Sequence, residues 1–219
     1  MRAAPKTAPG AAVYTRLTLP LYDLFVLGLC NRFVWACSTR HLLAHYNRHV
    51  AEQHLDVGVG TAYYLDHCRF PGATPQLSLL DLSPRSLEVT ARRLNRYEPR
   101  VQQADVFQPL PTDEQFGSIG LTYLLHCLPG SMAEKRIIFE RLGARLRPGG
   151  VLFGATILDE GVWHNPAGQG LMALYNRTGV FSNRHDGVEA LRANLRMIGE
   201  DIEIEIRGRV AVFAVRAPA

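Results

Sequence analysis

The sequence lacks the cysteine spacing of a metal site and any apolar run long enough to span a bilayer. None of its four cysteines forms a CxxC pair, so we expect small, mostly buried thiols in a reducing compartment rather than zinc ligands. The longest apolar stretch, residues 21–38, is interrupted by polar side chains and is too short for a membrane helix. The four cysteines are Cys30, Cys37, Cys68 and Cys127.

The sequence also lacks a secretory signal and a dense basic stripe. The first residues contain no apolar core, which predicts a cytoplasmic protein. The net charge is +4, but residues 1–50 carry +5 and residues 51–219 carry −1. This asymmetry indicates either a solvated cationic cap or a cap that attracts an acidic substrate. A nucleic-acid surface usually needs a denser basic stripe with interleaved aromatics, so we do not expect nucleic acid as a partner. We expect no membrane partner either, and the oligomeric state stays open.

What the sequence does contain is a regular alternation of strand and helix signals. Five apolar strands alternate with helices, which predicts an α/β fold with a doubly wound, mostly parallel sheet. Alternating apolar residues at 202–206 and 210–214, separated by Gly208, predict an antiparallel C-terminal hairpin and bring the sheet to seven strands. The predicted strands are 54–57, 77–80, 101–104, 116–125, 151–158 and the two arms of the hairpin.

The helical parts are signalled by caps and periodicity. Helices are expected near 20–36 and 39–53, 61–69 and 84–97, and after capping boxes at 131–134 and 186–189. We therefore predict a single domain over residues 1–219. Residues 1–50 would form a tail and N-terminal helical cap, residues 51–219 the core, and residues near 160–185 a lid.

A glycine turn follows the first predicted strand. Gly58 and Gly60 let the backbone turn sharply and let a ligand approach closely. Asp56 stands two residues before this turn, where it would repel the pyrophosphate of a nicotinamide cofactor. The turn also has Tyr63 where a dinucleotide site wants a third glycine. A cationic ligand, such as a sulfonium or an α-amino group, suits this turn better.

Two further acids end the next two predicted strands. Asp81 can accept hydrogen bonds from both hydroxyls of a ribose, and Asp105 from the exocyclic amine of adenine. Each aspartate alone is more often a helix cap or a turn former. At the ends of successive parallel strands, the three acids converge on one crevice and describe a nucleoside with a positive charge and no phosphate.

These residues resemble the class I S-adenosylmethionine-dependent methyltransferase family, of the small-molecule type. Asp56, Gly58 and Gly60 match its first motif, although Ala62 stands where the last glycine is usual. The segments 123–130 and 147–150 are also family-like. The resemblance implies S-adenosylmethionine as cofactor, with Asp81 on its ribose and Asp105 on its adenine. The donor site it implies comprises Tyr22, Asp56, Gly58, Gly60, Thr61, Asp81, Leu82, Asp105, Val106 and Tyr123.

Methyl transfer needs alignment more than functional groups, but an oxygen acceptor of high pKa also needs a base. His126, which follows the fourth strand, is the first candidate, with packing as its alternative. His164 follows the fifth strand, and His185 lies further along the same lid. Trp35, like Tyr22, either closes over the ligands or packs in the cap. A histidine stripe at 41, 45 and 49 is interpreted as a helix flank, and no metal is expected.

The absence of certain sequence motifs disfavours some classes of methyl acceptor. No Asn-Pro-Pro-Tyr segment follows the fourth strand, and no Pro-Cys nucleophile is present, so methylation of amides, of adenine and of cytosine is disfavoured. The apolar cap favours a small, mostly apolar acceptor, with an enolic or phenolic oxygen of a secondary metabolite as the leading prediction. Nitrogen or carbon methylation of a small molecule is the alternative, and so is a non-catalytic partner protein that only binds S-adenosylmethionine.

Overall fold

A computed structural model describes residues 31, 33–163 and 166–219 of the chain. One seven-stranded sheet runs through the described chain in the order β3-β2-β1-β4-β5-β7-β6. Strands β1 to β5 pair in parallel, and β7 runs antiparallel to both of its neighbours. The strands are β1 (Gln53–Val57), β2 (Gln76–Asp81), β3 (Arg100–Gln103), β4 (Phe116–Thr122), β5 (Leu146–Ile157), β6 (Asp201–Arg207) and β7 (Val210–Arg216). The predicted doubly wound sheet with its terminal hairpin is confirmed.

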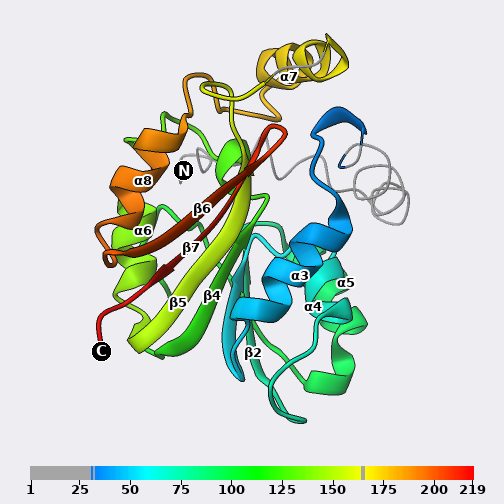
Figure 1. The fold of residues 1–219 in the computed structure, drawn as a ribbon. Coiled ribbons are helices and arrows are strands. Elements are labelled where there is room, and N and C mark those ends of the chain that lie inside the picture. The colour runs from blue at the N-terminus through cyan, green and yellow to red at the C-terminus, as the bar shows by residue number, and fades with distance from the viewer. Residues whose placement is uncertain (1–30, 32, 164–165) are drawn as a thin grey trace, which may run out of the picture.

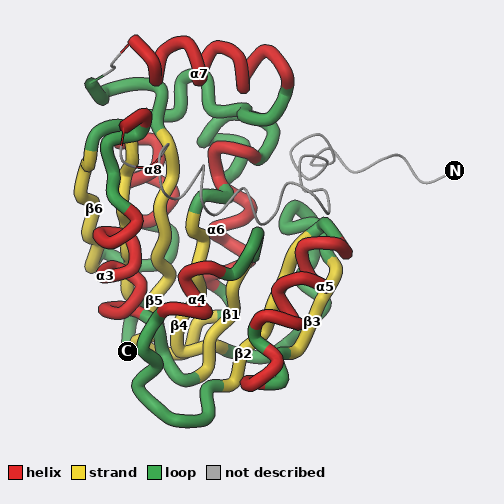
Figure 2. Tube along the Cα trace, turned by 90° about the vertical axis from the view of Figure 1, so that its right-hand side faces the viewer, coloured by secondary structure: helices red, strands yellow, loops and turns green. Residues whose placement is uncertain are grey.

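Helices cover both faces of the sheet (Figure 1). One face carries α3 (Thr39–His49), α4 (Tyr63–His67) and α5 (Pro84–Arg93), and the other carries α6 (Arg136–Gly143) and α8 (Val188–Leu195). Helix α7 (Pro166–Thr178) stands apart, beyond the ends of the strands in both views (Figures 1 and 2). Short 3-10 turns occupy Asn95–Tyr97 and Leu125–Cys127. No helix among the described residues is long and apolar enough to cross a bilayer.

Alternation along the strands produces two hydrophobic cores, one on each face. In β5, Val151 and Phe153 point to the face of α3, whereas Leu152 points to the face of α6 and α8. In β7, Val212 points to the face of α3, and Phe213 points to the face of α6 and α8. Residues 151–155 of β5 and 210–215 of β7 are therefore all apolar or glycine, as expected for strand segments covered on both faces.

Several predicted boundaries were wrong for identifiable reasons. Helix α3 ends at His49 because Val50 is already extended, so it does not reach residue 53. Strand β4 ends at Thr122, and residue 125 begins a 3-10 turn. Strand β5 begins at Leu146, earlier than predicted, because this residue pairs with Phe116 ahead of an irregularity in the ladder.

The two predicted capping boxes had different outcomes. Ser131 and Glu134 do exchange hydrogen bonds, although the regular helix begins only at Arg136. Asp186 does not cap α8, whose N-cap is Gly187 without a side-chain bond. Its carboxylate is instead buried in an ion pair with Lys135, at 2.7 Å, and so cannot reach the helix terminus.

The histidine stripe of α3 faces the terminal hairpin. His41 contacts Glu205 at 3.0 Å, and His45 Nε2 lies 3.0 Å from the Phe213 carbonyl oxygen. His49 lies 3.9 Å from Glu203. The stripe is thus the flank on which α3 rests against β6 and β7.

Candidate active site

The sheet changes its winding direction between β1 and β4. The chain leaves β1 toward β2 and β3, and then returns to the other side of β1 as β4. Parallel sheets bind ligands at such a switch point, outside the carboxyl ends of the strands. The glycine turn after β1 and Tyr123 after β4 line the same pocket there.

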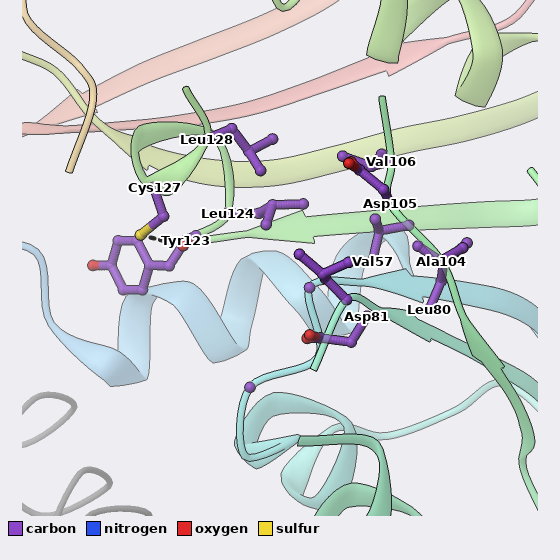
Figure 3. Close-up of a pocket in the computed structure, with 13 residues that line it drawn as sticks. Val57, Leu80, Asp81, Ala104, Asp105, Val106, Tyr123, Leu124, Cys127 and Leu128 are labelled. Atoms are coloured by element: carbon purple, nitrogen blue, oxygen red, sulfur yellow. Dashed lines mark hydrogen bonds between the residues drawn. The ribbon is translucent and has the colours of Figure 1, made fainter. Parts of the chain in front are cut away.

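An open pocket lies on one side of this turn. It is walled by residues at the carboxyl ends of β1 and β2, by the segment after β3 and by the segment after β4 (Figure 3). A second pocket lies on the other side and contains Asp56, Thr61 and Tyr46. Because Gly58, Gly60 and Tyr123 line both, the two pockets form one crevice folded around the turn. The first pocket is lined by Val57, Gly58, Gly60, Leu80, Asp81, Leu82, Ala104, Asp105, Val106, Tyr123, Leu124, Cys127 and Leu128.

The predicted donor residues fall into this crevice. Asp81, Leu82, Asp105 and Val106 line the first pocket, and Asp56 and Thr61 the second. Tyr22 and His164 lie outside the described residues.

The glycine turn has the backbone that its residues suggest. Gly58 and Gly60 both have positive φ, at 73° and 52°. A Cβ at Gly58 would lie 2.6 Å from a methyl carbon of Leu124, whereas a Cβ at Gly60 would meet nothing within 4 Å. Ala62, the departure from the family pattern, also adopts the left-handed region at φ 57° and caps α4. Alanine therefore occupies a conformation that glycine would adopt at lower cost.

The carboxyl group of Asp81 has a raised pKa. Burial raises its pKa to about 6, against the lowering effect of the main-chain N–H groups of Ser83 and Gly60. The Ser83 N–H donates to Oδ1 at 2.8 Å. In the same pocket, the Phe107 N–H donates to Oδ1 of Asp105 at 3.0 Å. The Asp105 carboxylate is thus held by its own turn, and the Asp81 carboxylate both by its own turn and by the main chain of the glycine turn after β1.

A series of buried hydrogen bonds, which sequence analysis missed, holds the Asp56 side chain in place. Oδ2 of Asp56 accepts a short hydrogen bond from the Tyr46 hydroxyl, which lies 3.0 Å from Nε2 of His54. Nδ1 of His54 lies 2.8 Å from Oγ of Ser118, and that oxygen accepts from the Ala51 N–H at 2.8 Å. Burial, and then the Asp56 charge, raise the pKa of Tyr46 well above its ordinary value, so the phenol stays protonated and donates.

In this series of hydrogen bonds, the position of one proton determines the positions of the next. Because Tyr46 donates its only proton to Asp56, it accepts from Nε2–H of His54, and Nδ1 then accepts from Ser118. Strand pairing sets the spacing, since His54 lies opposite Ser118 and Asp56 opposite Gly120. A Cβ on Gly120 would lie 3.2 Å from the Asp56 carboxylate and from the Tyr46 hydroxyl. The absence of that Cβ makes room for these hydrogen bonds.

In the sequence, Tyr46 recurs with Leu42 and Val50 at every fourth residue, which is the spacing of one helix face. Its 1% exposure agrees with that placement. A buried hydroxyl needs a hydrogen-bond partner, and this requirement could have predicted a polar contact for Tyr46. His54, with no exposed surface, gave the same signal inside an apolar strand.

His126 lies behind the crevice rather than in it. It is 3% exposed, and its ring packs edge-on against Phe181 and Tyr123. Nδ1 accepts from the Ile157 N–H at 3.3 Å. Burial, with a smaller effect of Lys135, lowers its pKa to about 3. The ring is a weak base whose lone pair faces β5, so this geometry favours the packing alternative.

The other predicted residues are scattered. His185 is exposed and contacts Glu160 at 2.6 Å. Trp35 is 2% exposed and packs against Phe181. Burial raises the pKa of Cys127, which lines the crevice, to about 12, so its sulfur stays a thiol.

Comparison with known proteins gives this crevice its context. A family model described as a methyltransferase domain matches residues 55–152. Demethylluteothin O-methyltransferase of Streptomyces thioluteus is 40% identical over 205 residues, which cover 93% of this chain and 89% of that one. N-methyltransferase vrtF of Penicillium aethiopicum is 38% identical over 190 residues, covering 84% and 78%.

A solved structure shows the same fold at lower identity. N-methyltransferase NodS from Bradyrhizobium japonicum, in complex with S-adenosyl-l-homocysteine, matches with a TM-score of 0.60 and 16% identity, covering 93% of this chain and 98% of that one. The extent of the two sequence matches, together with the fold, shows that this chain belongs to the class I S-adenosylmethionine-dependent methyltransferases.

Proposed function

We propose that this enzyme transfers a methyl group from S-adenosylmethionine to an enolic or phenolic oxygen of a small, mostly apolar secondary metabolite. The observation that carries the donor half is the crevice folded around Gly58 and Gly60, with three aspartates at its walls. The oxygen acceptor is supported by the 40% identity to an enzyme named as an O-methyltransferase. Nitrogen transfer remains the second candidate because a relative at 38% identity is named as an N-methyltransferase.

We assign the donor site residue by residue. Asp81 accepts from the ribose hydroxyls, and Asp105 from the adenine amine, while Leu82 and Val106 cover the ring. Asp56 faces the cationic methionine end from the second pocket, and Gly58, Gly60, Thr61 and Tyr123 close around the turn. The pockets fit this group, since they offer carboxylates at separate walls, and a pyrophosphate would be repelled by them.

Once bound, S-adenosylmethionine supplies a methyl group already activated for direct displacement. The chain contributes alignment and the exclusion of water. Tyr123 adopts a positive φ of 62° at the junction of the two pockets, a conformation rare for a bulky residue. We propose that this strained residue positions donor and acceptor against each other, with His126 as packing behind it.

The remaining parts complete one domain in this proposal. Residues 1–50 form the cap, with Tyr22 closing on the donor, and residues near 160–185, including His164, form the lid. A variant lacking residues 1–30 tests the cap: we expect it to keep the sheet and lose turnover. Full activity of this truncation would remove the cap from the site.

The acceptor proposal is tested with donor carrying a labelled methyl group. Purified protein is offered matched phenols, anilines and activated methylenes, and the product is located by mass spectrometry and NMR. We expect transfer to oxygen. Label found on nitrogen alone would favour the second candidate, and label found on carbon alone would contradict both. Calorimetric donor binding, measured separately, shows whether the donor half stands when no acceptor reacts.

A further inference from the structure

Arg209 lies in the turn that joins β6 to β7 and is 1% exposed. Its main chain is held on both sides: its N–H donates to the Trp35 carbonyl at 3.0 Å, and its carbonyl accepts from the Leu158 N–H at 2.8 Å. Its guanidinium is not held, because Nε, Nη1 and Nη2 all lack a hydrogen-bond partner within the described structure. A guanidinium keeps its charge in proteins, and a buried, unpaired charge is costly.

The side chain lines a hollow distinct from the donor crevice. Its lining includes Met172 and Asn176 of helix α7, together with Arg184 and Asp159 from outside that helix. The hollow shares no lining residue with either half of the donor crevice.

An aromatic layer separates the hollow from the crevice. Tyr123, which lines the crevice, contacts His126, and His126 contacts Phe181 at 4.5 Å between ring centroids. Phe181 contacts Trp35, whose carbonyl holds the backbone of Arg209. These ring contacts therefore run from the crevice to the residue that holds the backbone of Arg209.

The charges of the hollow favour an anion. Arg209 and Arg184 contribute two cations, and Asp159 one opposing charge. Asp159 makes no hydrogen bond to Arg209, and its Oδ2 accepts from the His185 N–H at 3.4 Å. Burial lowers the pKa of Arg209, partly offset by Asp159.

We propose that this hollow is a binding site for an oxyanion, a carboxylate or phosphate group engaged by the Arg209 guanidinium. The planar fork of donors matches such groups in a bidentate manner. The apolar side chain of Met172 beside it favours an oxyanion carried by a small organic body over a free inorganic ion. The site is independent of the proposed acceptor atom, because it rests on residues outside the crevice.

The test measures thermal stability of the full chain in an anion-poor buffer while phosphate, acetate or benzoate is added. The variant is Arg209→Met, and the matched control is Arg207→Met, an exposed arginine on the same hairpin. We expect the wild type and the control to gain at least about 2 °C at saturation, with half-saturation below about 10 mM, and Arg209→Met to gain nothing. Equal responses of all three proteins, or no saturation in that range, would overturn the proposal.

The free proteins give a second, independent readout. Replacing an unpaired buried cation by an apolar chain of similar length should raise the Tm of anion-free Arg209→Met by about 2 °C or more. Asp159→Asn should tighten the anion by removing a repulsive charge. If both variants instead melt well below the wild type without anion, the two residues pair with each other and no anion site exists.

The choice of anion identifies its source. Benzoate binding about tenfold tighter than phosphate and acetate indicates an organic acid, because only benzoate adds apolar contact with Met172. Equal affinities indicate a free inorganic anion at the same site. Either result requires that the response disappears in Arg209→Met.

Discussion

At the scale of single residues, the donor crevice depends on the charge of Asp81. Its pKa of about 6, against 3.8 for the ordinary group, means that the free protein takes up a proton here as the pH falls through 6. Proton uptake by Asp81 stabilises the donor-free folded protein. This contribution is fully present below pH 3.8, the ordinary pKa of the group, and is lost as the pH rises through 6. Donor binding runs in the opposite direction, since the ribose hydroxyls need the ionised carboxylate as acceptor.

We therefore predict that the donor dissociation constant of the wild type rises on acidification below pH 6, approaching about tenfold per pH unit. Asp81→Asn should bind about 10- to 100-fold more weakly at pH 8, through loss of charge-assisted hydrogen bonds. Its affinity should change little between pH 5 and 8. Calorimetry at several pH values measures both, and parallel profiles for the two proteins would exclude Asp81 as the titrating group.

His54 lines neither pocket of the donor crevice, yet it sets the direction of the Tyr46 hydroxyl and so of the Asp56 carboxylate. We predict that His54→Phe, which keeps the ring volume but removes both hydrogen bonds, weakens donor binding about tenfold or more. His54→Gln, which can still donate and accept, should recover part of the loss. The acceptor KM should stay unchanged in both. A purely structural role would lower the Tm of both variants without this selective effect on the donor.

His126 gives the sharpest choice between packing and catalysis. With its lone pair on the Ile157 N–H, we predict that His126→Gln lowers kcat by a similar factor for acceptors of high and low hydroxyl pKa. A general base would instead give a loss that shrinks as the acceptor becomes more acidic. Steady-state kinetics across a graded series of phenols checks this.

At the scale of elements, one buried ion pair fastens the segment before α8 to the start of α6. Lys135 and Asp186 have no exposed side-chain surface, and Lys135 Nζ also donates to the Ser182 carbonyl at 2.9 Å. Burial lowers the pKa of Lys135 and raises that of Asp186, so each depends on the other to remain charged.

Removing one partner of this pair should be severe. We predict that Lys135→Met costs about 3–5 kcal/mol of unfolding free energy, because it leaves Asp186 buried and alone. The double variant with Asp186→Leu should recover most of it. The exposed pair of Arg136 and Glu140, at 3.0 Å on the same helix, is the control: Arg136→Met should change stability by less than about 1 kcal/mol. Denaturant titrations measure all three, and an additive double variant would contradict the pairing.

The elements also show how far sequence reasoning reaches. Ser83 at the N-cap and Pro84 at the first helical position located the start of α5 correctly, because those signals are local, whereas the helix ends at Arg93 instead of residue 97. They misjudged Asp186, which looks like a cap but pairs with a lysine 51 positions away. A sequence pattern cannot reveal that competition, since the partner arrives only when the chain has folded.

At the scale of the whole molecule, the predicted topology and the crevice follow from the strand order and the glycine turn. Nine of the ten predicted donor residues line the crevice, and Tyr22 lies outside the described chain. The chain of Tyr46, His54 and Ser118 was not predicted, because its members come from a helix and two strands that meet only in the sheet. His126 was expected in the crevice, but the 3-10 turn after β4 directs its ring toward Phe181.

The hydroxyl of Tyr46 joins a helix of the N-terminal region to the carboxylate beside the donor. Any ligand that binds to the Asp56 carboxylate therefore also affects the hydrogen bond that holds α3 in place. By thermodynamic linkage, the stability of α3 affects the binding of that ligand in turn. Donor binding should slow amide hydrogen exchange in the α3 turn around Tyr46, and Tyr46→Phe should abolish that protection while α5 keeps its own. An unresponsive α3 would mean that the helix is equally rigid with and without donor. Protection of α3 that is lost in Tyr46→Phe would show that this single phenol transmits donor binding to the N-terminal region.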